Sequence, residues 1–164
     1  AGRVVLKPVV GLVVGVSASR APFVSTATAN AAGADAGRFM QRVVGADVEF
    51  SRGHYLLRAE TVASAFDLPT IAPRLTAVAT MVEGRYRVTP RVHVAARVDH
   101  LGFNTIAGST RSATWEAPVA RWEVGTGYSV QRNLQLRAAF QHNWRDGGRV
   151  RRMTALATQV LYWF

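Results

Sequence analysis

The sequence predicts an antiparallel transmembrane β-barrel, to which this chain of 164 residues contributes eight strands. Three observations lead to this fold class. Apolar and polar residues alternate with a period of two, short turns alternate with long loops, and the last strand ends on aromatic residues. Because successive side chains of a strand point to opposite faces, the alternation gives one apolar and one polar face. Residues 1–164 form a single domain with no linker.

The expected strands follow one another along the whole chain. They span Val5–Ser19, Arg42–Ser51, Tyr55–Ala65, Leu75–Val88, Val92–Phe103, Val119–Val130, Leu134–Trp144 and Arg149–Phe164. The connections at 52–54, 89–91 and 131–133 are tight, whereas those at 20–41, 66–74 and 104–118 are long, and only the hairpin at 146–148 departs from this contrast. Tight periplasmic turns and long external loops are typical of outer-membrane barrels. An even number of strands then places both termini in the periplasm.

The composition excludes a transmembrane helix, because no apolar run reaches the length of about 18 residues that a spanning helix needs. Lipid offers the backbone no hydrogen bonds, so a closed barrel is the remaining way to span. The formal charge of +10 suggests nucleic acid. However, the charges are dispersed among apolar residues, and Arg145, Arg149, Arg151 and Arg152 are better explained by contact with lipid phosphates of the outer leaflet. We therefore expect lipid and lipopolysaccharide as partners, and no nucleic acid.

The polar face of the expected strands carries acids and arginines in similar number. Asp47, Glu49, Arg58, Glu60, Glu83, Arg85, Arg87, Arg97, Asp99, Arg121, Glu123 and Arg137 are expected to face the lumen. In a closed eight-stranded barrel such residues would pair and fill the interior. In a larger barrel they would line a wetted wall, where the arginines favour anions. The sequence leaves both arrangements open.

Aromatic residues on the apolar face gather beside the tight turns and at the chain end. Phe50, Tyr55, Tyr86, Tyr128, Tyr162 and Phe164 occupy these positions. Such a belt is typical of a membrane interface, where amphipathic rings sit at the level of the headgroups. A soluble barrel would show the same alternation turned inside out, but it would not require this placement of aromatic rings.

The segment 20–41 is rich in small and polar residues and is expected to be a long, mobile external loop without a core of its own. In a porin it could fold inward as a constriction. In a small barrel it would extend into solvent or meet a partner.

The sequence carries no recognisable catalytic or metal site. The four histidines are scattered without the short spacing of metal ligands, and no Gly-x-Ser-x-Gly motif is present. Asp99 and His100 are adjacent, so their side chains point to opposite faces of a strand. We therefore expect no enzymatic activity, no cofactor and no metal.

Three segments, at 45–60, 82–91 and 121–133, resemble the C-terminal half of phosphate-selective-porin-like outer-membrane proteins. This resemblance implies a barrel of about sixteen strands, often a trimer, that prefers anions and of which this chain supplies half. The final aromatic residues are similar to the signal by which the barrel-assembly machinery recognises its clients. The leading hypothesis is a porin for passive diffusion of small, anionic solutes. The alternative is a closed eight-stranded barrel with a structural or adhesive role and no conducting pore.

Overall fold

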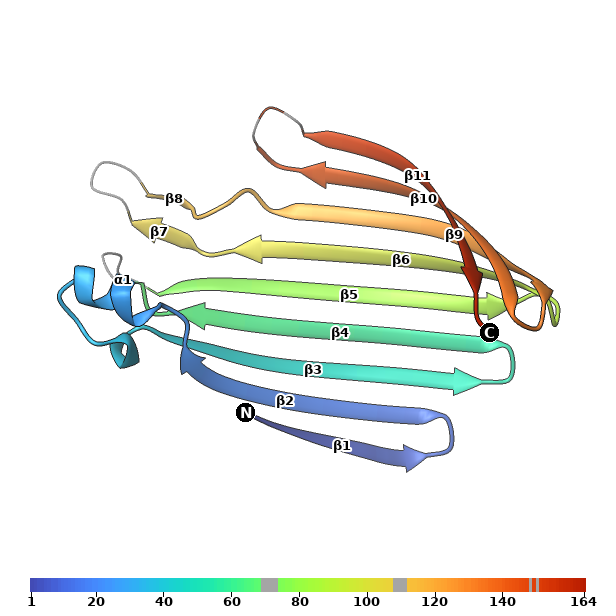
Figure 1. Ribbon diagram of the computed structural model, residues 1–164, viewed down its shortest axis with the longest axis horizontal. Coiled ribbons are helices and arrows are strands. Elements are labelled where there is room, and N and C mark those ends of the chain that lie inside the picture. Colours follow the sequence, from blue (N-terminus) through green and yellow to red (C-terminus); the bar gives the residue numbers. More distant parts are fainter. Residues whose placement is uncertain (69–73, 108–111, 148, 150) are drawn as a thin grey trace.

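A computed structural model describes residues 1–68, 74–107, 112–147, 149 and 151–164. In this part of the chain, nine antiparallel strands form one curved sheet (Figure 1). They are β1 (Gly2–Val9), β2 (Leu12–Pro22), β3 (Met40–Arg52), β4 (Tyr55–Phe66), β5 (Leu75–Arg87), β6 (Val92–Phe103), β9 (Val119–Gln131), β10 (Leu134–Arg145) and β11 (Arg152–Tyr162). A small separate hairpin consists of β7 (Thr105–Ala107) and β8 (Ser112–Thr114), and two short helices are α1 (Thr26–Ala31) and η1 (Ala36–Arg38). Neither helix is long and apolar enough to cross a membrane.

The strand count differs from the prediction because the first expected strand, Val5–Ser19, is a hairpin. β1 and β2 pair with each other, and the turn between them lies at Val10 and Gly11. Gly11 has a φ of 86°, a left-handed conformation that glycine adopts without steric cost. The apolar residues on both sides of this turn made the segment look like one continuous strand. Because the segment contains two strands, the described sheet has nine strands rather than eight.

The sheet is open in the described residues. Its strand order runs from β1 to β11, and these two edge strands do not pair with each other. The closed eight-stranded barrel is therefore wrong for this chain by itself. The additional strand also changes the position of the first residue, because the N-terminal residue lies at the far end of β1 from the tight turns and the C-terminal residue lies at the turn end (Figure 1). The two ends of the chain therefore lie at opposite ends of the strands, and the side of the membrane that each faces stays a prediction.

The two faces of the sheet differ in exposure as well as in chemistry. We call the face that carries the predicted lumenal charges the inner face, and the apolar one the outer face. Along β6, the inner residues Arg97 and Asp99 are partly buried, whereas the outer residues Val94, Ala96 and Val98 are exposed. This is the reverse of a soluble sheet, in which the apolar face is covered. The pattern is that of a barrel wall with hydrocarbon outside.

The segment between β2 and β3 is folded, which corrects the expectation of a mobile loop without a core. Ser25 caps α1 by accepting a hydrogen bond from Thr28 N at 3.2 Å. Ala29 and Phe39 are almost completely buried. The ring of Phe23 lies edge-on to that of Phe66, with centroids 5.3 Å apart. Since Phe66 belongs to the inner face, the segment leans over the loop end of that face.

The buried apolar side chains of the described residues all lie at this loop end. They are Ala29, Phe39, Leu75 and Ile106. The middle of the sheet has no such core, because a single layer has nothing to pack against. The predicted long connections at 66–74 and 104–118 and the hairpin at 146–148 extend outside the described residues, as does residue 150 of the last predicted strand.

Candidate functional site on the inner face

The strand register places all twelve predicted lumenal charges on the inner face. In one row across the sheet, directly opposite residues alternate in sign, and this row consists of Glu49, Arg58, Glu83, Arg97 and Glu123. Directly opposite side chains on one face lie close enough to interact, and opposite charges there stabilise a sheet. The alternating charges therefore make the inner face hydrophilic, and they also stabilise the pairing of the strands.

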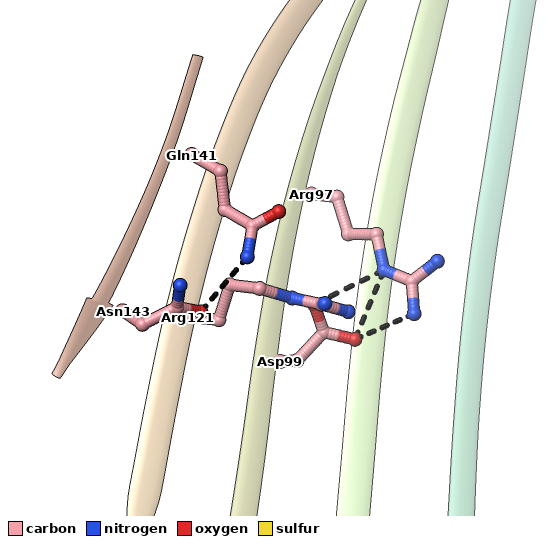
Figure 2. Close-up of polar contacts among 5 residues, drawn as sticks. All are labelled: Arg97, Asp99, Arg121, Gln141 and Asn143. Atoms are coloured by element: carbon pink, nitrogen blue, oxygen red, sulfur yellow. Dashed lines mark hydrogen bonds and ion pairs between the residues drawn. The ribbon is translucent and has the colours of Figure 1, made fainter. Parts of the chain in front are cut away.

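The neighbouring row contains a carboxylate that two arginines share (Figure 2). Asp99 Oδ1 accepts a hydrogen bond from Arg97 Nη2 at 2.7 Å, and Asp99 Oδ2 accepts one from Arg121 Nε at 2.8 Å. Beside them, Gln141 Nε2 donates to Asn143 Oδ1 at 3.0 Å. The charge-assisted bonds of Asp99 tie β6 to β9 and are stronger than neutral ones, whereas the Gln141–Asn143 bond lies within β10.

Two further ion pairs lie on the β1 to β4 side of the inner face. Arg58 Nε donates to Glu49 Oε2 at 2.7 Å, and Arg3 Nη2 donates to both oxygens of Asp47 at 2.9 Å. Arg3 was missed by the sequence reasoning, because it precedes the point at which the first strand was expected to begin. The only available signal was the alternation of Arg3 with Val4 at the start of the chain.

Three arginines near the turn end of the inner face differ from the others. Arg85, Arg87 and Arg137 make no ion pair with any described residue. Arg87 lies opposite His93 on β6, and Arg137 lies opposite Gly127 on β9. We call Arg85, Arg87, His93 and Arg137 the arginine cluster. The sequence predicted its arginines individually but not their grouping, and it did not single out His93 for this face.

Glycine makes room for the cluster. His93 and Gly127 are opposite each other, and a Cβ atom on Gly127 would lie 2.1 Å from His93 Cε1. The imidazole therefore occupies the space that any larger residue at Gly127 would fill. Gly127 thus packs against an inner-face side chain and does not belong to a phosphate-binding loop, since it lies within β9.

A hollow of about 220 Å³ lies beside the cluster, lined by charged groups that include Arg85, Arg97, Arg137 and the acids Glu83 and Glu123. Arg137 is held in place by a hydrogen bond from its Nε to Gln135 Oε1 at 2.8 Å, and Gln135 is itself buried. Guanidinium groups bind oxyanions through several donors at once. The arrangement can therefore hold a small anion. The described residues contain no group of side chains that could hold a metal ion.

The outer face carries the predicted aromatic residues at the turn end. Tyr55 and Tyr86 are directly opposite and have ring centroids 4.8 Å apart, while Tyr162 and Phe164 lie 6.4 Å apart. Phe50 lies opposite Leu12 beside the β1–β2 turn, and Tyr128 lies opposite Val92 beside the β5–β6 turn. Their role as a belt at the membrane interface stays a prediction.

Several polar groups on the outer face of the described strands are hydrogen-bonded. Thr126 Oγ1 donates to the carbonyl oxygen of His93 at 2.9 Å, and the hydroxyl groups of Thr61 and Thr80 bond to each other at 2.7 Å. His142 Nδ1 and Thr154 Oγ1 are 2.9 Å apart. Because an unpaired polar group is costly in hydrocarbon, these pairings suit a face that contacts lipid.

Asp99 and His100, the acid and histidine that are adjacent in the sequence, do not form a catalytic pair in the described structure. Asp99 belongs to the inner face and His100 to the outer face, as their adjacency requires. The absence of enzymatic activity stays a prediction.

No family model matches this sequence, and no curated protein matches it either. Among solved structures, OmpT (in-vitro folded), an outer membrane protein of Vibrio cholerae, is similar over 98% of this chain, with a TM-score of 0.63 and 12% sequence identity. The described sheet has the fold of part of an outer-membrane β-barrel wall. This chain spans 54% of the matched protein, so it corresponds to about half of such a barrel. The open sheet with two free edges agrees with that proportion.

Proposed function

We propose that this chain forms part of the wall of a porin-like barrel in a bacterial outer membrane, through which small solutes diffuse passively with a preference for anions. The observation that carries this proposal is the arginine cluster. Arg85, Arg87 and Arg137 share one region of the inner face and lack ion-pair partners among the described residues. Their charge is therefore available to solutes.

The remainder of the inner face contributes less to selectivity, because its charges neutralise one another. Asp99 is shared between Arg97 and Arg121, and Glu49 bonds to Arg58. A compensated pair produces a weaker field at a distance than an isolated charge. An unpaired arginine cluster raises the local concentration of anions and lowers that of cations. Rings of arginine side chains have this effect in anion-conducting pores.

The arginine cluster favours oxyanions among the possible solutes, because guanidinium forks match phosphate geometry. The edges of β1 and β11 require further strands to complete a pore, since unpaired backbone groups in hydrocarbon cost several kcal/mol each. We further propose association into a trimer and recognition of the C-terminal strand by the barrel-assembly machinery. We also propose that the long connections, including 23–39, lie on the outer side of the membrane.

The test is single-channel conductance of the purified native protein in a planar bilayer, together with its intact mass. We expect steady conductance steps and a reversal potential, in a salt gradient, that shows anions to be more permeant than cations. A mass well above the 17.8 kDa of this chain is expected, because the described strands form an open sheet. Absence of conductance in a correctly inserted protein would reject the proposal.

The contribution of the arginine cluster is measured with the double variant Arg85→Gln and Arg137→Gln. We expect the ratio of anion to cation permeability to fall severalfold towards one. The matched control is Glu49→Gln with Arg58→Gln, which removes a bonded pair and leaves the net charge unchanged. If both variants change selectivity equally, the arginine cluster has no special role.

A further inference from the structure

The outer face has a shallow apolar hollow of about 650 Å³ near the turn end, within the size range of ligand pockets. Its floor consists of small side chains on four neighbouring strands, namely Gly84, Ala96, Thr126 and Ala138. Large side chains stand on either side, with Tyr55, Leu57 and Tyr86 at one rim and Phe140 and Leu156 at the other. In one row across the sheet, Gly84, Ala96 and Val124 lie between the larger Leu57 and Phe140. In the adjacent row, Tyr55 and Tyr86 are followed by Val94, Thr126 and Ala138.

The lining suits a hydrocarbon chain. The hydroxyl group of Thr126, the polar side chain in the floor, already donates to the His93 carbonyl oxygen at 2.9 Å. The Thr126 hydroxyl group therefore does not need a hydrogen-bond acceptor from a bound molecule. The Tyr55 and Tyr86 rings pack against each other at one rim, and they present an apolar surface of the kind that lines ligand pockets.

Two exposed arginines lie at the end of the strands that form this floor. Arg91 is in the turn between β5 and β6, and Arg132 is in the turn between β9 and β10. The two turns are adjacent, because Ser129 N donates to the Arg91 carbonyl oxygen at 2.8 Å. Neither arginine makes an ion pair with a described residue. Ala96 is five residues beyond Arg91, about 17 Å at the usual rise of a strand.

We infer that this hollow binds one acyl chain of a phospholipid whose phosphate is held by Arg91 and Arg132. The apolar floor and the cationic turn match the two ends of such a lipid in order and in distance. Arginine is suited to the phosphate because its guanidinium donates two parallel hydrogen bonds. The inference rests on the outer face contacting lipid and not on conduction, so it can fail or succeed independently of the proposed pore.

A second copy of the chain fits this surface less well. Copies related by rotation about the membrane normal keep equivalent residues at the same level. A dimer across the hollow would therefore bring the Arg91 and Arg132 turns of both copies together without a counter-charge, at a cost in electrostatic energy. A phospholipid supplies the missing negative charge.

The experiment is native mass spectrometry of the purified protein released from detergent after equilibration with phosphatidylglycerol or, separately, with phosphatidylcholine. We expect one retained lipid and preferential retention of the anionic one. The double variant Arg91→Gln and Arg132→Gln should retain at least fivefold less phosphatidylglycerol and lose the preference. Ala96→Phe, which fills the floor, should reduce retention of both lipids.

Matched controls separate this site from general lipid adhesion. Ala46→Phe places the same bulk on an exposed outer-face position of β3, outside the hollow. Arg20→Gln with Arg38→Gln removes two exposed arginines at the opposite end of the sheet. Both controls should retain lipid like the parent protein. Equal retention in all variants would overturn the inference, and so would a dimer that Ala96→Phe converts to a monomer without any change in bound lipid.

Discussion

Asp99 holds two arginines with one carboxylate, since Arg97 Nη2 lies 2.7 Å from Oδ1 and Arg121 Nε lies 2.8 Å from Oδ2. Arg97 is two residues away on the same strand, and Arg121 is directly opposite on β9. The Asp99 side chain is only 19% exposed, so water screens this network less than it would a surface pair. Asp99 therefore both stabilises the pairing of β6 with β9 and offsets the positive charge of two arginines.

Replacing Asp99 with Asn should destabilise the sheet by about 1–3 kcal/mol, because two arginines lose the charged acceptor of their hydrogen bonds. The measurement is urea unfolding of the protein inserted in lipid vesicles. Glu60→Gln is the control, since Glu60 makes no ion pair among the described residues and lies opposite the like-charged Asp47. Equal losses in both variants would contradict a specific role of Asp99.

Gly11→Ala should disrupt the first hairpin. An alanine there would adopt a positive φ, and its Cβ atom would lie 2.1 Å from the Ser51 carbonyl oxygen. Because that atom belongs to the backbone, it cannot rotate away, and we expect a loss of roughly 2–4 kcal/mol. Hydrogen exchange of the β1 amides should rise.

Gly33→Ala is the comparison for this hairpin variant, since Gly33 also has a positive φ but open space around the missing Cβ. It should cost only about 1 kcal/mol. If the two glycine variants behave alike, the close contact between the β1–β2 turn and Ser51 is not part of the folded protein.

Phe39→Ala should loosen the segment between β2 and β3. The Phe39 side chain is 4% exposed, and truncating a buried phenylalanine costs about 3–5 kcal/mol in a well-packed core. We expect faster tryptic cleavage after Arg38, with the strands still protected. Phe23→Ala removes a ring that is more exposed and should accelerate cleavage less. An unchanged cleavage rate in Phe39→Ala would mean that the segment has no core.

The attachment of the loop before β9 should weaken in acid. The pKa of Glu116 is lowered from its ordinary value of 4.5 by a hydrogen bond from Ala117 N and by Arg145, whose Nη2 lies 2.5 Å from Oε1. Because the pKa of Glu116 is lower in the folded protein than in the unfolded chain, the ionised carboxylate stabilises the folded form at pH values above its ordinary pKa. This stabilisation is lost as the pH falls through the pKa of the folded protein. The attachment should therefore be intact at pH 7 and loosen below about pH 4.5.

The readout for this loop is the fluorescence of Trp115, isolated as the difference between the parent protein and Trp115→Phe. Glu116→Gln should remove the transition, because the amide does not titrate. A transition that persists in Glu116→Gln would assign the acid response to another group.

The faces of the sheet could be predicted from residue order alone. Alternation is a local property, so a residue such as Arg97 and its neighbour Val98 must point to opposite sides of any regular strand. The tight turns at Arg52-Gly53-His54 and Gln131-Arg132-Asn133 are local as well, and the strands on both sides of each pair as expected. The fold class followed from such features.

The first hairpin and the segment between β2 and β3 could not be predicted in the same way. Val10 and Gly11 lie in an apolar run, and the two turn signals there, Pro8 and Gly11, are separated by valines that are typical of a strand. The burial of Ala29 and Phe39 depends on partners at distant positions, such as Phe66 beside Phe23. Composition alone describes that segment as too polar to fold, because it does not include surfaces supplied by other strands.

The sequence by itself determined that this chain forms strands with one charged and one apolar face. Only the tertiary structure decided which charges neutralise one another and which remain available. Arg121 meets Asp99 because β6 and β9 pair in one particular register, whereas Arg137 in the neighbouring strand meets Gly127 and keeps its charge free of any described acid. Residue identity and period are encoded locally, but the register is fixed by the pairing of whole strands, and a charge is compensated only when that pairing brings an acid within a few ångströms.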